Sequence, residues 1–128
     1  MAVQSIAASL PSLRSLGYDL HGDPVWDPIQ QANIAMATTP LGISVELVEP
    51  IGDRSPARRF LKGHPGEGCI YHLCWGVDDL DQWWERLRAR GAIPVGSPVL
   101  AAAFDNTRVA FMFMDGNLVE LLEERHGA

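Results

Sequence analysis

Two segments of the chain carry apolar residues at helical spacing, and each segment ends in a glycine. The first stripe is Ile6, Leu10 and Leu13, followed by Gly17. The second stripe is Leu80, Trp83, Trp84 and Leu87, followed by Gly91. Glycine suits the left-handed conformation that commonly ends a helix. We therefore predict amphipathic helices over residues 5–16 and 79–90, each with its apolar stripe packed against a core.

Short runs of strand-forming residues lie between turn signals. They predict strands that begin at residue 18 and that span residues 32–37, 43–49, 70–77, 92–95, 108–114 and 118–123. Asp115-Gly116 predicts a tight hairpin turn between the last two strands. A Pro- and Gly-rich stretch from residue 50 to residue 68 contains a short helical candidate, with Ser55 as its N-cap and Pro56 at the first position. We interpret this stretch as a connector.

The two halves repeat one pattern. Residues 42–49 read almost as residues 116–123, at an offset of 120 − 46 = 74. The same offset maps the first helical stripe onto the second and Gly17 onto Gly91. We predict an α+β fold in which two repeated βαβββ modules form a cup-shaped mixed sheet. The single domain covers residues 1–128, with module one at 1–50, the connector at 51–68 and module two at 69–124.

Charge and hydropathy exclude several classes of partner. The formal charge of −6 and the isoelectric point near 5.0 argue against nucleic acid and anionic membranes as partners. No apolar run approaches the roughly 18 residues of a spanning helix, so we expect a cytoplasmic protein. Cys69 and Cys74 would lie on opposite faces of one strand, which makes a disulfide between them implausible and favours structural roles for both.

Strand alternation gathers three ligand-type side chains on one face. If Val45, Leu47, Val119 and Leu121 pack toward the helices, Glu46 and Glu120 face the other way, as does His72 in the strand 70–77. A carboxylate within an apolar strand is costly to bury without a partner. One imidazole and two carboxylates suit a divalent ion such as Mn, Fe, Co, Ni or Zn. The alternative is a hydrogen-bonded core histidine and two partly exposed glutamates.

Seven runs of the chain together match a known sequence pattern: 45–50, 55–56, 60–61, 66–72, 77–80, 108–111 and 118–121. With these runs the chain resembles methylmalonyl-CoA epimerases and their glyoxalase-like relatives in the vicinal oxygen chelate superfamily. The resemblance implies a metal in a cup-shaped sheet and chemistry that stabilises an enolate of a small acyl or hydroxy-carbonyl substrate. It identifies His72 and Glu120 as metal ligands and Glu46 as a third. It also implies a homodimer.

The resemblance further implies a fourth ligand, a histidine on the first strand of module one. The repeat would put it at 72 − 74 = −2, before Met1, and only Ala2 and Val3 remain of that strand. We therefore expect a truncated first strand. Three explanations stay open: a longer native chain, a site completed by water or a neighbouring chain, or a lineage without the metal.

The residues expected to contact substrate are Asn33, Cys74, Phe104 and Met112. Asn33 falls near a position where some epimerases carry a catalytic glutamate, but a neutral amide cannot remove a proton. The catalytic base is therefore unknown. Two functions remain: a metal-dependent epimerase, isomerase or lyase, and a non-catalytic protein of the bleomycin-resistance kind that sequesters a small molecule in a cup lined by Trp26, Phe104 and Met112. The alternative for these three side chains is ordinary packing in the core or in loops.

Overall fold

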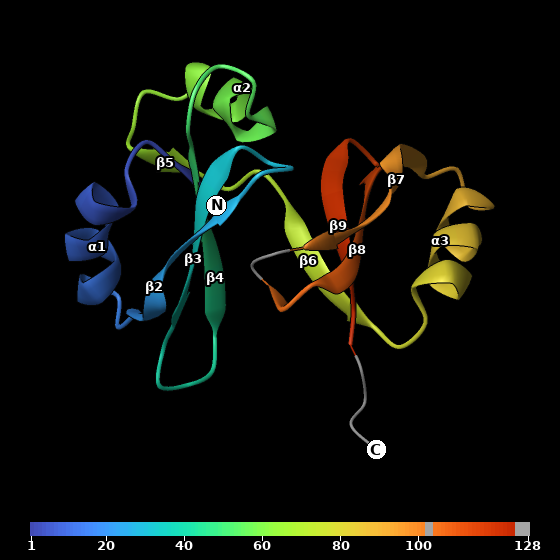
Figure 1. Cartoon of the computed structure of the whole chain (residues 1–128), viewed down its shortest axis with the longest axis horizontal. Coiled ribbons are helices and arrows are strands. Elements are labelled where there is room, and N and C mark those ends of the chain that lie inside the picture. The colour runs from blue at the N-terminus through green and yellow to red at the C-terminus, as the bar shows by residue number, and fades with distance from the viewer. Residues whose placement is uncertain (102–103, 125–128) are drawn as a thin grey trace. The chain divides into compact units, whose positions relative to one another are not determined.

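The computed structural model of the chain describes residues 1–101 and 104–124, which divide into two units. One unit is Met1–Tyr71 and the other is His72–Ala128. The first unit contains β1 (Ala2–Val3), α1 (Ile6–Ser15), β2 (Asp19–Asp27), β3 (Ala32–Thr38), β4 (Ser44–Pro50), α2 (Pro56–Lys62) and β5 (Gly68–Cys69) (Figure 1). The second contains β6 (Leu73–Val77), α3 (Leu80–Arg88), β7 (Ile93–Ala101), β8 (Thr107–Met114) and β9 (Asn117–Glu123).

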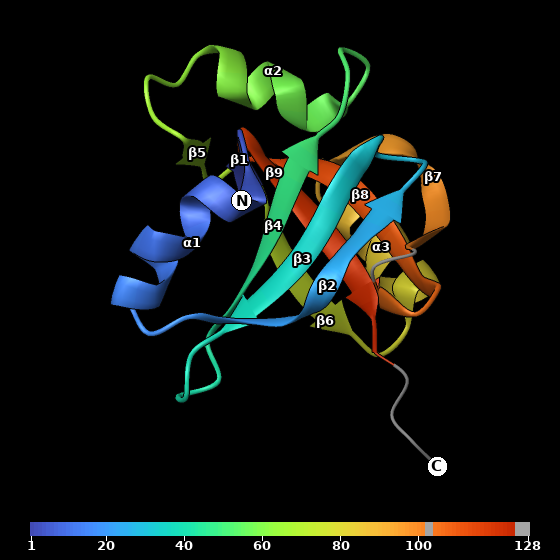
Figure 2. The ribbon, with the colours of Figure 1, turned by 60° about the vertical axis from the view of Figure 1, so that its left-hand side comes forward.

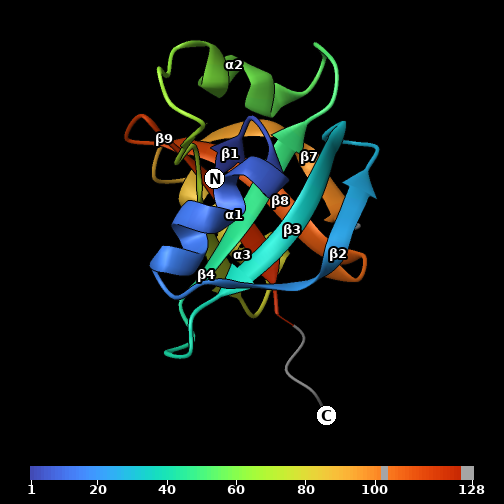
Figure 3. The ribbon, with the colours of Figure 1, turned by 90° about the vertical axis from the view of Figure 1, so that its left-hand side faces the viewer.

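The first unit is a five-stranded mixed sheet with the order β2-β3-β4-β1-β5. β1 runs parallel to β4, and the other neighbouring strands are antiparallel. Figure 3 shows β2, β3 and β4 side by side, with α1 beside them. Ile6 and Leu13 of α1 form a buried cluster with Ala35 and Leu47 of the sheet. The predicted apolar stripe of the first helix is therefore a core stripe, and it covers one face of this sheet.

The second unit is a four-stranded mixed sheet with the order β6-β9-β8-β7. β6 runs parallel to β9, and α3 lies against one face of the sheet. Leu80 of α3 is fully buried in a cluster with Met112 and Leu121, and the remaining apolar side chains of the helix pack around that cluster. No helix in the described ranges has the length and apolar character needed to cross a bilayer.

The backbone repeats at the offset found in the sequence. Ala2 pairs with Val48 in one unit, and Gly76 pairs with Leu122 in the other, so both members of the pair shift by 74. β2 and β7 span equivalent residues, and each has a bulge that begins at an equivalent position, after His21 and after Val95. The predicted α+β fold of two βαβββ modules is confirmed, and β1 contains only Ala2 and Val3 as expected.

The third strand of each module departs from this offset by one residue. Met36 of β3 lies opposite Glu46, whereas Phe111 of β8 lies opposite Glu120, so these strands are related by 111 − 36 = 75. The hairpin between β8 and β9 is correspondingly short. It turns at Asp115 and Gly116 with φ of 49° and 79°, the left-handed pair that a two-residue hairpin prefers.

Two strand predictions need correction. The predicted strand 70–77 is divided into β5 and β6, because β5 pairs with β1 whereas β6 pairs with β9 from Leu73 onward. Tyr71 consequently packs on Phe60 of α2, with ring centroids 4.9 Å apart. β7 is longer than the predicted 92–95. Its prolines and glycine are compatible with a strand because β7 lies at a sheet edge and contains a bulge.

A glutamate at the end of the last strand binds the first turn of the helix in each module. Glu49 Oε2 accepts a hydrogen bond of 2.8 Å from the Ile6 amide, and Glu123 Oε1 accepts one of 3.1 Å from the Leu80 amide. Amides in the first helical turn have no partner within the helix, and the positive end of the helix dipole favours a carboxylate there. These contacts attach each helix to its own sheet.

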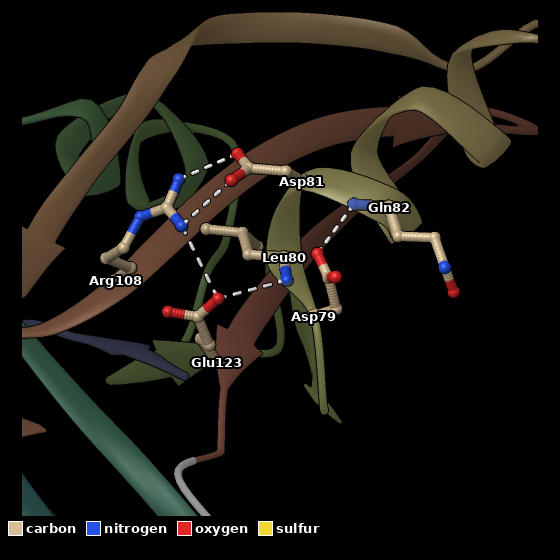
Figure 4. Close-up of polar contacts among 6 residues, drawn as sticks. All are labelled: Asp79, Leu80, Asp81, Gln82, Arg108 and Glu123. Atoms are coloured by element: carbon tan, nitrogen blue, oxygen red, sulfur yellow. Dashed lines mark hydrogen bonds and ion pairs between the residues drawn. The ribbon is translucent and has the colours of Figure 1, made fainter.

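Arg108 of β8 extends this arrangement in the second unit (Figure 4). Its guanidinium makes two hydrogen bonds to the Asp81 carboxylate, of 2.7 and 3.1 Å, and a longer one of 3.4 Å to Glu123. The bonds from Arg108 lower the pKa of Asp81 and raise that of Arg108. Three elements, β8, β9 and α3, therefore meet at one charged cluster.

The Asp81–Arg108 pair makes stability depend on pH. Because folding lowers the pKa of Asp81 below the ordinary 3.8, the pair stabilises the protein above that value and loses its effect as pH falls through the folded pKa. We expect Asp81→Asn to destabilise the protein at neutral pH and the difference from wild type to vanish as pH falls through the folded pKa of Asp81. Urea unfolding over a series of pH values measures this. Asp115→Asn, in the hairpin turn, is the control. A difference that persists at low pH would contradict the ion-pair explanation.

Candidate metal centre

Glu120 is a buried carboxylate in the middle of an apolar strand. Its neighbours Val119 and Leu121 belong to the core under α3, so the alternation of β9 turns Glu120 to the other face of the sheet. On that face it lies opposite Phe111 of β8 and Cys74 of β6. The predicted orientation of Glu120, away from the helix, is therefore correct.

His72 lies next to Glu120. It immediately precedes β6, and its Nε2 is 2.9 Å from Glu120 Oε2, within hydrogen-bond distance. The side chains are only 4% and 2% exposed. The imidazole ring also meets the ring of Phe111 in an edge-to-face arrangement with centroids 5.7 Å apart. A buried carboxylate needs a polar partner to offset its loss of hydration, and His72 supplies one.

The His72–Glu120 pair fits a divalent metal ion. An imidazole nitrogen and a carboxylate oxygen are donors that Mn, Fe, Co, Ni and Zn accept together. The two donor atoms already lie within hydrogen-bond distance of each other. Glu120 lies in β9, which pairs with β6 and β8, and His72 directly precedes β6. The paired strands therefore position both residues.

Glu46 occupies the equivalent place in the first unit. It lies in β4 between Val45 and Leu47, and both of those side chains pack with the cluster under α1. Glu46 therefore faces away from α1, as Glu120 faces away from α3. The structure thus bears out the predicted facing of both glutamates, each within its own sheet.

The four predicted substrate residues lie in different surroundings. Cys74 is exposed and shares the face of Glu120. Phe104 is half-buried between β7 and β8. Met112 is 0% exposed in the cluster under α3, which leaves no surface for a ligand. Asn33 lies opposite Glu49, whose carboxylate binds the first turn of α1, so Asn33 is on the helix side of its sheet. Trp26 pairs with Asn33 and is partly exposed.

Cys69 agrees with the structural role predicted for it, and its thiol is free. Cys69 is buried in β5, and burial raises the pKa of its thiol, which disfavours the reactive thiolate.

Phe111 is a site residue that the sequence reasoning missed. The signal was available, because the two-residue turn at Asp115-Gly116 fixes Met114 opposite Asn117. Counting back three pairs from there brings Phe111 opposite Glu120. The hairpin motif therefore predicts the register of the two strands as well as the turn.

A cavity of about 230 Å³ lies on the other face of the second sheet. It is lined by Trp75, Gly76, Val77, Trp83, Leu87, Met114, Val119 and Leu121. These side chains belong to the helix side, and none of them is acidic or basic. The chemistry of this unit is therefore on the face of Glu120.

Known proteins with similar sequences and structures point to one family. A family profile described as Glyoxalase/Bleomycin resistance protein/Dioxygenase superfamily matches residues 1–111. A mitochondrial methylmalonyl-CoA epimerase from Dictyostelium discoideum is 31% identical over 93% of this chain and 76% of its own length. An ethylmalonyl-CoA/methylmalonyl-CoA epimerase from Cereibacter sphaeroides is 31% identical over 94% of this chain and 91% of its length.

A solved structure also matches the fold. The crystal structure of methylmalonyl-CoA epimerase from Mycobacterium tuberculosis gives a TM-score of 0.81 at 25% identity, over 97% of this chain and 83% of that one. These similarities agree with the family resemblance inferred from the sequence.

Replacing His72 tests how the buried pair contributes to stability. His72→Leu removes the imidazole from the Glu120 carboxylate, and we expect it to lower the free energy of unfolding by about 2–3 kcal/mol. The double variant His72→Leu/Glu120→Leu should recover most of this loss, because no buried charge remains. Urea unfolding of chelator-treated protein measures both. The exposed His64→Leu serves as the control. Additive losses in the double variant would show that the two side chains are not coupled.

Proposed function

The chain belongs to the Glyoxalase/Bleomycin resistance protein/Dioxygenase superfamily, and from that premise we propose a metal-dependent epimerase that acts beside the carbonyl of an acyl-CoA thioester. The curated relatives are epimerases, so an enzyme of the epimerase or isomerase type is the coarser conclusion. Methylmalonyl-CoA, the substrate in the names of both relatives, is the proposed substrate. The observation that carries the proposal is the buried His72–Glu120 pair on the helix-free face of its sheet.

We propose that His72, Glu120 and Glu46 hold the metal ion. The support for Glu46 is its equivalence to Glu120 in the repeat and its position on the helix-free face of its own sheet. Two carboxylates and one imidazole leave coordination positions open, as a catalytic ion requires. The ion could be Mn, Fe, Co, Ni or Zn. Family resemblance also supports a homodimer.

The proposed reaction inverts the carbon between the thioester carbonyl and the substrate carboxylate. A general base takes the proton from that carbon, negative charge moves to the thioester oxygen, and a general acid supplies a proton to the opposite side of the carbon. A bound divalent ion would supply positive charge beside that oxygen. The residues of the chain supply position and surroundings. The apolar ring of Phe111 and the burial of His72 and Glu120 limit water around the reacting group, which strengthens electrostatic stabilisation.

Metal content is the first test of this proposal. We expect about one divalent ion per chain in the purified protein and loss of most of it in His72→Gln and in Glu46→Gln, since each removes a ligand. Elemental analysis by mass spectrometry measures the content. His64→Gln and Glu67→Gln, both at exposed positions of the connector, should keep the wild-type amount. Full metal content in Glu46→Gln would remove Glu46 from the ligand set.

Activity is the second test. The wild-type protein should incorporate solvent deuterium at the carbon between the two carbonyl groups of methylmalonyl-CoA, and chelator should abolish the exchange until metal is restored. Glu120→Gln should lower kcat/KM by about a hundredfold or more, because one ligand charge is lost. NMR or mass spectrometry follows the deuterium. Absence of exchange by fully metal-loaded wild-type protein would refute the proposed function.

A further inference from the structure

The charges of the chain are strongly segregated. The segment 54–62 contains Arg54, Arg58, Arg59 and Lys62 and no acidic residue. The rest of the chain therefore holds six Lys and Arg against 16 Asp and Glu, a formal charge of −10. We call residues 54–62 the basic segment. Because the rest of the protein is acidic, an anionic ligand is attracted to the basic segment and repelled from other parts of the surface.

The basic segment is largely α2, and its apolar side fixes the direction of its charges. Ala57 and Leu61 are each 2% exposed, and Phe60 packs on Tyr71. Arg59 and Lys62 are exposed on the remaining side, three residues apart, which makes them neighbours on the helix surface. Within the described residues, neither forms an ion pair. Both positive charges are therefore accessible to a ligand.

Arg58 fixes α2 to the end of the strand that carries Glu46. Its Nη2 donates a hydrogen bond of 2.7 Å to the Pro50 carbonyl, and its Nε donates one of 3.3 Å to the Gly52 carbonyl. Figure 2 shows the end of β4 directed toward α2. Glu46 lies four residues before Pro50 in β4, so the two are about 13 Å apart along the strand.

We propose that Arg59 and Lys62, assisted by Arg54, bind the phosphate groups of the coenzyme A part of the substrate. This inference rests on the proposed function, which puts the acyl end of a CoA thioester near Glu46. The pantetheine arm of coenzyme A separates the thioester from the phosphates by a length that can span the distance from Glu46 to α2. Arg and Lys both bind phosphate through charge-assisted hydrogen bonds, and Arg can make two at once. The strong negative charge elsewhere disfavours nucleic acid as the anionic ligand.

The test compares two substrates that differ only in their phosphates. Arg59→Ala/Lys62→Ala is assayed with methylmalonyl-CoA and with the same acyl group on pantetheine, which has no phosphate. We expect the KM for the CoA thioester to rise about tenfold with little change in kcat, because the lost contacts are far from the reacting carbon. The pantetheine thioester should give the wild-type KM. Arg14→Ala/Arg90→Ala, which removes two exposed charges elsewhere, should leave both KM values unchanged.

The possible outcomes separate this inference from the proposed function. An unchanged KM for the CoA thioester, or an equal rise for both thioesters, would overturn the role of the basic segment while epimerase activity stands. If wild-type protein epimerises neither substrate, the proposed function fails. Calorimetry with coenzyme A alone then decides the inference: binding weakened about tenfold by Arg59→Ala/Lys62→Ala supports phosphate recognition, and equal binding refutes it.

Discussion

The two-residue period of a β-strand is the constraint on which both modules depend. In β4 and in β9, two glutamates stand three residues apart, so their side chains lie on opposite faces. Glu49 and Glu123 bind the first amide of the helix on one face. Glu46 and Glu120 consequently point away from the helix. A strand that rotated to bring Glu120 under α3 would bury a carboxylate among apolar residues and detach Glu123 from the helix. One carboxylate thus determines the direction of the other.

Most of the fold could be predicted because the two halves of the chain repeat one pattern, so that a weak signal in one half is supported by the equivalent signal in the other. The helical stripes, the capping glycines Gly17 and Gly91 and the Asp115-Gly116 turn all correspond to observed structure. The errors occurred where long-range pairing overrides local pattern. Nothing in the sequence of residues 70–77 indicates that the chain stops pairing with β1 before it begins to pair with β9. The length of β7 was hidden by prolines that only an edge position makes acceptable.

The facing of the site residues could be predicted on β4 and β9, which follow the offset of 74 residues. It was harder to predict on β8, which departs from that offset. The facing of Glu46 and Glu120 came from alternation alone. The core position of Met112 could not be obtained from the repeat, because β8 is displaced by one residue from the common offset and a one-residue slip exchanges the two faces of a strand. At the common offset Met112 corresponds to Thr38, but its structural counterpart is the buried Ala37. The helix-capping roles of Glu49 and Glu123 depend on contacts across 43 residues, which no local pattern reveals.

The matching bulges of β2 and β7 say something about ancestry. Gly22 and Gly96 both have φ of 71°, at equivalent points of the two strands, and each is followed by Pro and Val at the same spacing. The bulge and its Gly-x-Pro-Val run therefore recur together, as the duplication of one gene segment would leave them. Where the two modules differ at equivalent positions, each module shows a residue that the same backbone position of the other module can accommodate.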